Sequence, residues 1–127
     1  MIPLLFLASA SADLDALDQA VTKCDRSIAN PAFASEAARR STFLLDAFRE
    51  QESIVNDRLT LADQRRTLRE AGSLKPTEQK QFDLQQAALD DRQKALNDKR
   101  MLEGIREDAT DSMRRYFLNN CPSGKAE

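Results

Sequence analysis

The sequence predicts an all-α protein: a long antiparallel, coiled-coil-like helical hairpin, with a shorter N-terminal helix packed at its base and one disulfide. Three observations indicate this fold. The 127 residues contain only three glycines and four prolines, too few turn residues for a β-sandwich or a doubly wound sheet. Two stretches of about 40 residues repeat apolar residues every seven positions, which is typical of coiled-coil packing. Only a Gly-Ser-Leu-Lys turn separates them, so the two helices must run antiparallel.

Residues 1–12 are predicted to be a signal peptide. They carry no charge, residues 2–7 are almost all large and apolar, and small residues follow at positions 8–12. An apolar core followed by small-x-small cleavage sites is typical of export signals, although the usual positively charged start is missing. The alternative is a buried N-terminal strand. Because the segment is too short to span a bilayer, we expect a periplasmic or secreted protein without stable membrane insertion after cleavage.

Residues 13–127 are predicted to form a single helical domain with helices at about 13–29, 31–71 and 76–119. Asn30 and Pro31 are expected to separate the first two helices, because asparagine caps helices and proline suits the first helical position. Gly72 is expected to end the second helix, and Pro76 to begin the third.

Each long helix carries an apolar stripe, which is its expected packing face. In the second helix the stripe consists of neighbouring pairs seven residues apart, widened by Leu44 and Leu59. These pairs are Ala47/Phe48, Ile54/Val55 and Leu61/Ala62, followed by Leu68. The stripe of the third helix includes Phe82, Ala88/Leu89, Ala95/Leu96, Leu102, Ile105, Ala109, Met113 and Tyr116/Phe117. Most aromatic residues lie far from Gly72, so we expect a thick three-helix base and a thin two-helix arm.

Cys24 and Cys121 are predicted to form one structural disulfide. An even number of cysteines in an exported chain favours pairing, and residues that face each other in the hairpin should have numbers adding up to about 148. The two cysteines come close to this register. The alternative is two unrelated buried thiols. Whether the first helix folds back on the hairpin or leans outward is left open.

The composition disfavours most catalytic chemistry. The chain has no histidine, which excludes mechanisms that need imidazole, and its three glycines are isolated, which excludes a glycine-rich phosphate loop. Two cysteines without histidine fit no zinc motif. We therefore expect no enzyme, no catalytic residue, no cofactor and no metal site.

Several charged residues and Gly104 are interpreted from their positions along the two long helices. The acids of the third helix could bind a divalent cation but are interpreted as a solvated face; they are Glu103, Glu107, Asp108 and Asp111. Glu36 and Arg40 are expected to pair on the outer face of the second helix. Four arginines near the turn could mark a partner groove or could cover apolar surface with their stems; they are Arg58, Arg65, Arg66 and Arg69. Gly104 is either a hinge or a place that leaves room for a phenylalanine ring.

The charge distribution bears on function. Acids and bases nearly cancel, 21 against 19, and are interspersed, so no basic face for nucleic acid is expected. We expect an exported, non-enzymatic interaction module, such as a scaffold, adaptor or chaperone-like arm. Its protein partner is unidentified, and a homo-oligomer through the arm is possible. The alternative is a small secreted inhibitor of a cell-wall or host enzyme.

Overall fold

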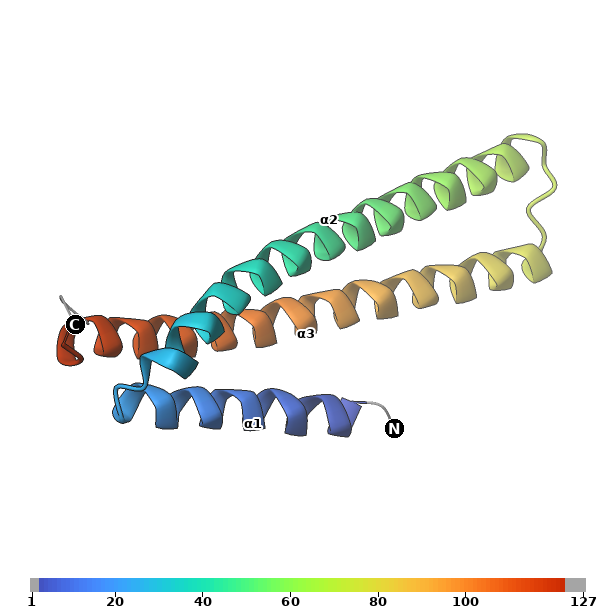
Figure 1. The fold of residues 1–127 in the computed structure, drawn as a ribbon. Coiled ribbons are helices and arrows are strands. Elements are labelled where there is room, and N and C mark those ends of the chain that lie inside the picture. The colour runs from blue at the N-terminus through green and yellow to red at the C-terminus, as the bar shows by residue number, and fades with distance from the viewer. Residues whose placement is uncertain (1–2, 123–127) are drawn as a thin grey trace. The chain divides into compact units, whose positions relative to one another are not determined.

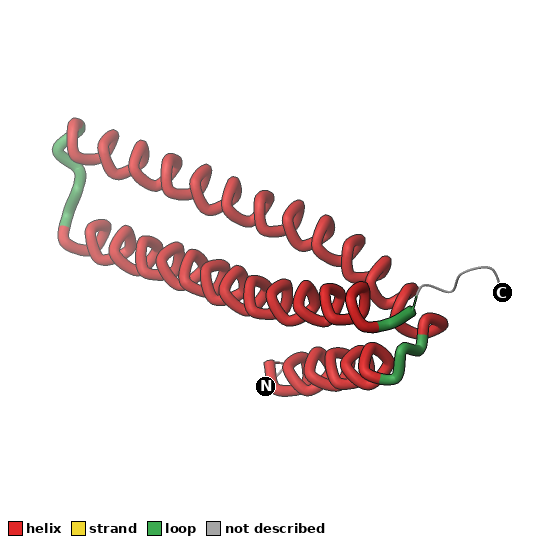
Figure 2. Tube along the Cα trace, turned by 90° about the vertical axis from the view of Figure 1, so that its left-hand side faces the viewer, coloured by secondary structure: helices red, strands yellow, loops and turns green. Residues whose placement is uncertain are grey.

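The computed structural model describes the backbone of residues 3–122 and the side chains of residues 13–122. It contains α1 (Pro3–Thr22), α2 (Arg26–Glu70) and α3 (Pro76–Asn120), and the predicted all-α fold is confirmed (Figure 1). The short connections between the helices are green in Figure 2. The two long helices pack together, and α1 contacts both. Within residues 3–122, no helix is long and apolar enough to cross a membrane.

The chain divides into two compact units. Unit 1 contains α1, the part of α2 up to Ser41 and the part of α3 from Glu103. Unit 2 is Thr42–Leu102, which holds the rest of α2 and α3 and the turn between them. The predicted signal peptide, residues 1–12, lies entirely outside the residues whose side chains are described, so its cleavage stays a prediction.

The predicted boundary at Asn30 and Pro31 is wrong, because α1 already ends at Thr22 and Pro31 lies inside α2. The turn is made at Cys24, whose φ of 54° is in the left-handed region. Such a residue ends a helix when the following amide reaches back over the last turn. The left-handed conformation of Cys24 therefore ends α1 before Asn30 and Pro31 are reached.

Hydrogen bonds around Asp25 explain both sides of this turn. Its amide donates to the carbonyl oxygen of Ala20 at 2.8 Å, which completes the end of α1. Its own carbonyl oxygen accepts the amide of Ala29 at 2.9 Å, and its carboxylate accepts the hydroxyl of Ser27 at 2.6 Å. Asp25 is thus the N-cap of α2, a position that aspartate favours.

Unit 1 has a core to which all three helices contribute. Its buried residues are Leu17, Ala20, Val21, Ala29, Phe117 and Cys121. The ring of Phe33 packs against Phe117 with centroids 5.9 Å apart. The guanidinium of Arg26 lies 5.3 Å from the centre of the Phe117 ring and donates to the carbonyl oxygens of Cys121 and Pro122. Arg26 therefore holds the start of α2 against the end of α3.

Unit 2 is an antiparallel helix pair with a narrow apolar seam. Its buried residues repeat every seven positions: Ala47, Ile54 and Leu61 on α2, and Phe82, Leu89 and Leu96 on α3. Cross-helix pairs such as Arg58–Asp90 fit the predicted register. The turn also follows the prediction, because Gly72 has a φ of 69° and the amide of Ser73 reaches back to the carbonyl oxygen of Leu68.

The buried apolar stripe of α2 is narrower than predicted. Only the first residue of each neighbouring pair is buried, whereas Phe48 and Val55 are exposed, as are Leu44 and Leu59. In unit 2, α2 has α3 as its single neighbour among the described residues, and the next residue along a helix points about 100° away. Tyr116 in unit 1 is exposed in the same way, so the expectation that it and Phe48 fill a core is also wrong.

Candidate functional site

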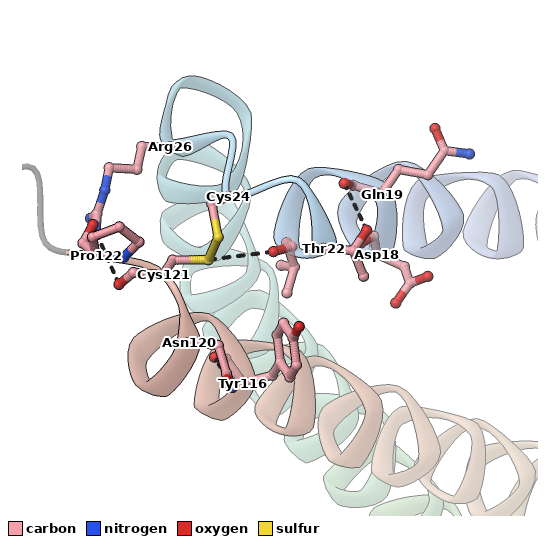
Figure 3. The surroundings of a disulfide bond; sticks show 10 residues. Asp18, Gln19, Thr22, Cys24, Arg26, Tyr116, Asn120, Cys121 and Pro122 are labelled. Atoms are coloured by element: carbon pink, nitrogen blue, oxygen red, sulfur yellow. Dashed lines mark hydrogen bonds between the residues drawn. A yellow bond between two sulfur atoms is a disulfide. The ribbon is translucent and has the colours of Figure 1, made fainter.

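Cys24 and Cys121 are joined by a disulfide, with their Cα atoms 5.4 Å apart (Figure 3). Cys24 lies in the turn between α1 and α2, and Cys121 directly follows α3. Because α1 ends before Cys24, both cysteines reach the same place without any detour of the chain. The bond closes a separation of 97 residues and ties the α1–α2 turn to the end of α3. The predicted pairing of Cys24 with Cys121 is therefore present.

A cluster of four charged residues joins α2 to α3 inside unit 1. We call Glu36, Arg39, Glu103 and Arg106 the ion-pair cluster. Arg39 donates to Glu103 at 2.6 and 2.7 Å and to Glu36 at 2.6 Å. Arg106 Nε donates to Glu36 Oε1 at 3.1 Å. Glu36 is 7% exposed and Glu103 is 9% exposed, so both carboxylates are buried and both are paired.

Contacts within the ion-pair cluster keep Glu36 and Arg39 in their charged forms. Burial raises the pKa of Glu36, but the hydrogen bonds and charges of Arg39 and Arg106 outweigh burial and lower it to about 2. Hydrogen bonds to Glu103 and Glu36 raise the pKa of Arg39. Glu36 is therefore a poor proton acceptor at neutral pH. The arrangement suits a fixed contact between two helices better than acid–base chemistry.

Two predictions about charge fail in this region. Glu36 does not form the outer-face pair with Arg40, because it points into the ion-pair cluster. Arg40 instead donates to the Thr110 hydroxyl and to Asp111 at 2.9 Å, and its buried Nε has no hydrogen-bond partner within the described residues. Glu103 is not part of a solvated face. Within residues 13–122, no three His, Cys, Asp or Glu side chains are grouped so that they could hold a metal ion.

A signal for Glu103 was present in the sequence. The buried row of α3 repeats every seven residues and continues through polar positions; it consists of Phe82, Leu89, Leu96, Glu103, Thr110 and Phe117. A charged residue in such a row must be paired to be buried at an acceptable cost. Counting every seventh position along the row, whatever the residue type, would have identified both Glu103 and Thr110 as buried.

Unit 2 also carries polar contacts across its seam. Gln51 and Gln93 exchange amide hydrogen bonds of 2.8 and 3.0 Å. Arg92 donates to Glu50 at 3.0 Å and to Asp57 at 2.7 Å, and these bonds raise the pKa of Arg92. A surface groove of about 310 Å³ lies beside this network. Its charged residues, Asp57 and Arg92, already pair with each other.

Three of the four arginines near the turn make separate contacts. Arg58 pairs with Asp90 at 2.9 Å, and Arg65 donates to Gln79 at 3.2 Å, so both connect α2 to α3. Arg66 pairs with Asp63 on its own helix. The guanidinium groups of these arginines therefore form their contacts within unit 2.

Gly104 lies inside α3 with open space around it. A Cβ added there would meet nothing within 4 Å, so the interpretation that it makes room for a phenylalanine ring is wrong. The hinge interpretation stays a prediction.

The most conspicuous surface feature is an apolar row on α2 in unit 2. We call Leu44, Phe48, Val55 and Leu59 the exposed row; they are 65%, 63%, 44% and 64% exposed. At 100° per residue, the four side chains fall within about 60° of one face of the helix. Leu45 borders the row and is also exposed.

Comparison with known proteins adds no candidate: no protein-family model, curated protein or solved structure matches the chain.

Proposed function

We propose that the protein is an exported, non-enzymatic helical interaction module that binds a protein partner through the exposed row of α2. The exposed row carries this proposal. Isolated exposed leucines are ordinary, but large apolar side chains gathered on one face are a feature of interaction sites. Three of the four are more than 60% exposed.

The helix beneath the exposed row favours binding. Directly beside the row, Ile54 is fully buried and packs with Leu96 of α3. The cross-helix bonds of Gln51 and Arg92 hold the same stretch of α2. A row presented on a fixed helix loses little conformational freedom on binding, which favours affinity. The near balance of charge, −2 for the whole chain, favours a protein partner over a polyanion.

Export is supported by two independent features. Residues 1–12 have the composition of a signal peptide, and the Cys24–Cys121 disulfide suits an oxidising compartment. Mass spectrometry of the protein from its native cell should find a mature N-terminus at Ser11 or Asp13. Recovery of a chain that begins at Met1 from the cytosol would contradict export.

Photo-crosslinking in the native cell tests the interaction surface. A photoreactive amino acid replaces Phe48 in one variant and Leu84 in the matched control. Leu84 is an exposed apolar residue of unit 2, on α3, and is 58% exposed. We expect a discrete crosslinked adduct from position 48 and none from position 84. Equal crosslinking at the two positions, or none at position 48, would overturn the proposal.

A further inference from the structure

We propose that the partner of the exposed row is a second copy of this chain, packed with its α2 antiparallel to the first about a two-fold axis. The inference rests on the proposed function, because it names the occupant of the same surface. It is carried by the spacing of the exposed row along α2.

The members of the exposed row have the same spacing in both directions along α2. Successive members are four, seven and four residues apart, so the row is symmetric about a point between Gln51 and Glu52. A two-fold antiparallel arrangement places Leu44 opposite Leu59 of the second copy, and Phe48 opposite Val55. An isologous interface requires a surface that is complementary to itself in this way.

The two apolar rows of α2 allow both contacts at once. The buried row, Ala47, Ile54 and Leu61, faces α3 within unit 2. The exposed row lies about 100° around the same helix, because its central members directly follow Ala47 and Ile54 in sequence. One α2 helix can therefore pack against α3 on one side and against the second α2 on the other. Two hairpins would then form a four-helix contact.

The available area is near the lower limit for a stable dimer. With ordinary side-chain areas, the exposed row and Leu45 leave about 500 Å² of apolar surface per chain, so a two-fold pair would bury about 1,000 Å². Specific interfaces begin at about this size. The expected dimer is therefore specific but reversible, and its population depends on protein concentration.

One charged residue lies beside the centre of the proposed interface. Glu52 is exposed and sits seven residues after Leu45 and seven before Leu59. The two-fold axis would bring the two Glu52 side chains close together, and like charges so placed repel. The neighbouring Gln51 is already bonded to Gln93 and Arg100. The Glu52→Gln variant should consequently dimerise more tightly than the natural chain.

Sedimentation of the full, disulfide-bonded chain tests the dimer. Leu59→Glu should weaken self-association at least tenfold, whereas the matched surface change Leu84→Glu should leave it unchanged. Circular dichroism checks that both variants stay helical. A natural chain that remains monomeric at the highest soluble concentration, or an equal effect of the two variants, would overturn the inference. Should position 48 crosslink to a different protein while the chain is monomeric, the proposed function stands and this inference fails.

Cysteine crosslinking tests the antiparallel geometry. In the two-fold arrangement, the two copies of residue 52 are offset by about 1.5 Å along the helix axis, and those of residue 59 by about 22 Å. Under mild oxidation, Glu52→Cys should form disulfide-linked dimers several-fold faster than Leu59→Cys. Equal rates, or faster linkage through position 59, would contradict the arrangement.

Discussion

Arg39 of α2 and Glu103 of α3 are joined by two parallel hydrogen bonds, from Nη1 to Oε2 at 2.6 Å and from Nη2 to Oε1 at 2.7 Å. A guanidinium and a carboxylate paired in this way fix distance and orientation together. Glu36 shares the same guanidinium, and Arg106 closes the set. The contact between α2 and α3 in unit 1 therefore depends on directional bonds as well as on apolar packing.

Removing Glu103 from this pair should destabilise the protein, because it leaves the partly buried charge of Arg39 under-bonded. Glu103→Gln should lower the free energy of unfolding by about 2 kcal/mol, less than for a fully buried pair because Arg39 is partly solvated. The exposed pair Arg66–Asp63 provides the control: Arg66→Gln should cost less than about 0.5 kcal/mol. Denaturant unfolding measures both, and equal costs would contradict the role of the ion-pair cluster.

Stability should depend on pH through Glu36. Its folded pKa of about 2 lies below the ordinary value of 4.5, so the folded state favours the charged form. This contribution is fully present above the ordinary value and is lost as the pH falls toward the folded value. It amounts to about 3 kcal/mol. Unfolding free energies should fall between pH 5 and pH 3 in the natural chain and fall less in Glu36→Gln. Parallel pH curves for the two proteins would contradict this.

Neighbouring residues in the α2 stripe should differ sharply in their contribution to stability. Ile54 is 0% exposed, so Ile54→Ala should cost about 3 kcal/mol, from lost burial and the cavity left behind. Phe48→Ala should cost less than about 1 kcal/mol in dilute solution, where its side chain faces water. Thermal unfolding at low protein concentration measures both changes. A larger cost for Phe48 would show that its ring is buried in the single chain.

Gly104→Ala should stabilise the protein by up to about 1 kcal/mol. Alanine has the higher helix propensity, and the added Cβ meets nothing within 4 Å. The melting temperature should rise accordingly. A decrease would mean that Gly104 is needed for a bend or a close approach, and would favour the hinge interpretation.

Strong local signals made much of the fold predictable. Gly72 and Pro76 mark the turn because their backbone preferences suit a helix end and a helix start. The seven-residue apolar repeat predicted the pairing of α2 with α3, and the same register brought Cys24 and Cys121 together. The boundary at Pro31 failed because Cys24 adopts a left-handed conformation that its residue type does not favour.

The candidate surface was only half predictable. The pairs Ala47/Phe48 and Ile54/Val55 are apolar throughout, so the residue types alone do not indicate which member is buried. That choice depends on the direction of the neighbouring helix. Glu103 was misassigned for a related reason. Its charged side chain suggested exposure to solvent, whereas its position in the seven-residue repeat required burial.

We expect the exposed row to be covered in the working protein. Hydroxyl-radical footprinting at working concentration and after dilution tests it most directly, by comparing oxidation of Phe48 and Leu59 with that of Leu84, which is similarly exposed in the single chain. We expect Phe48 and Leu59 to be protected relative to Leu84 at working concentration, and we expect this protection to disappear on dilution. Oxidation of Phe48 and Leu59 relative to Leu84 that is the same at both concentrations would contradict it.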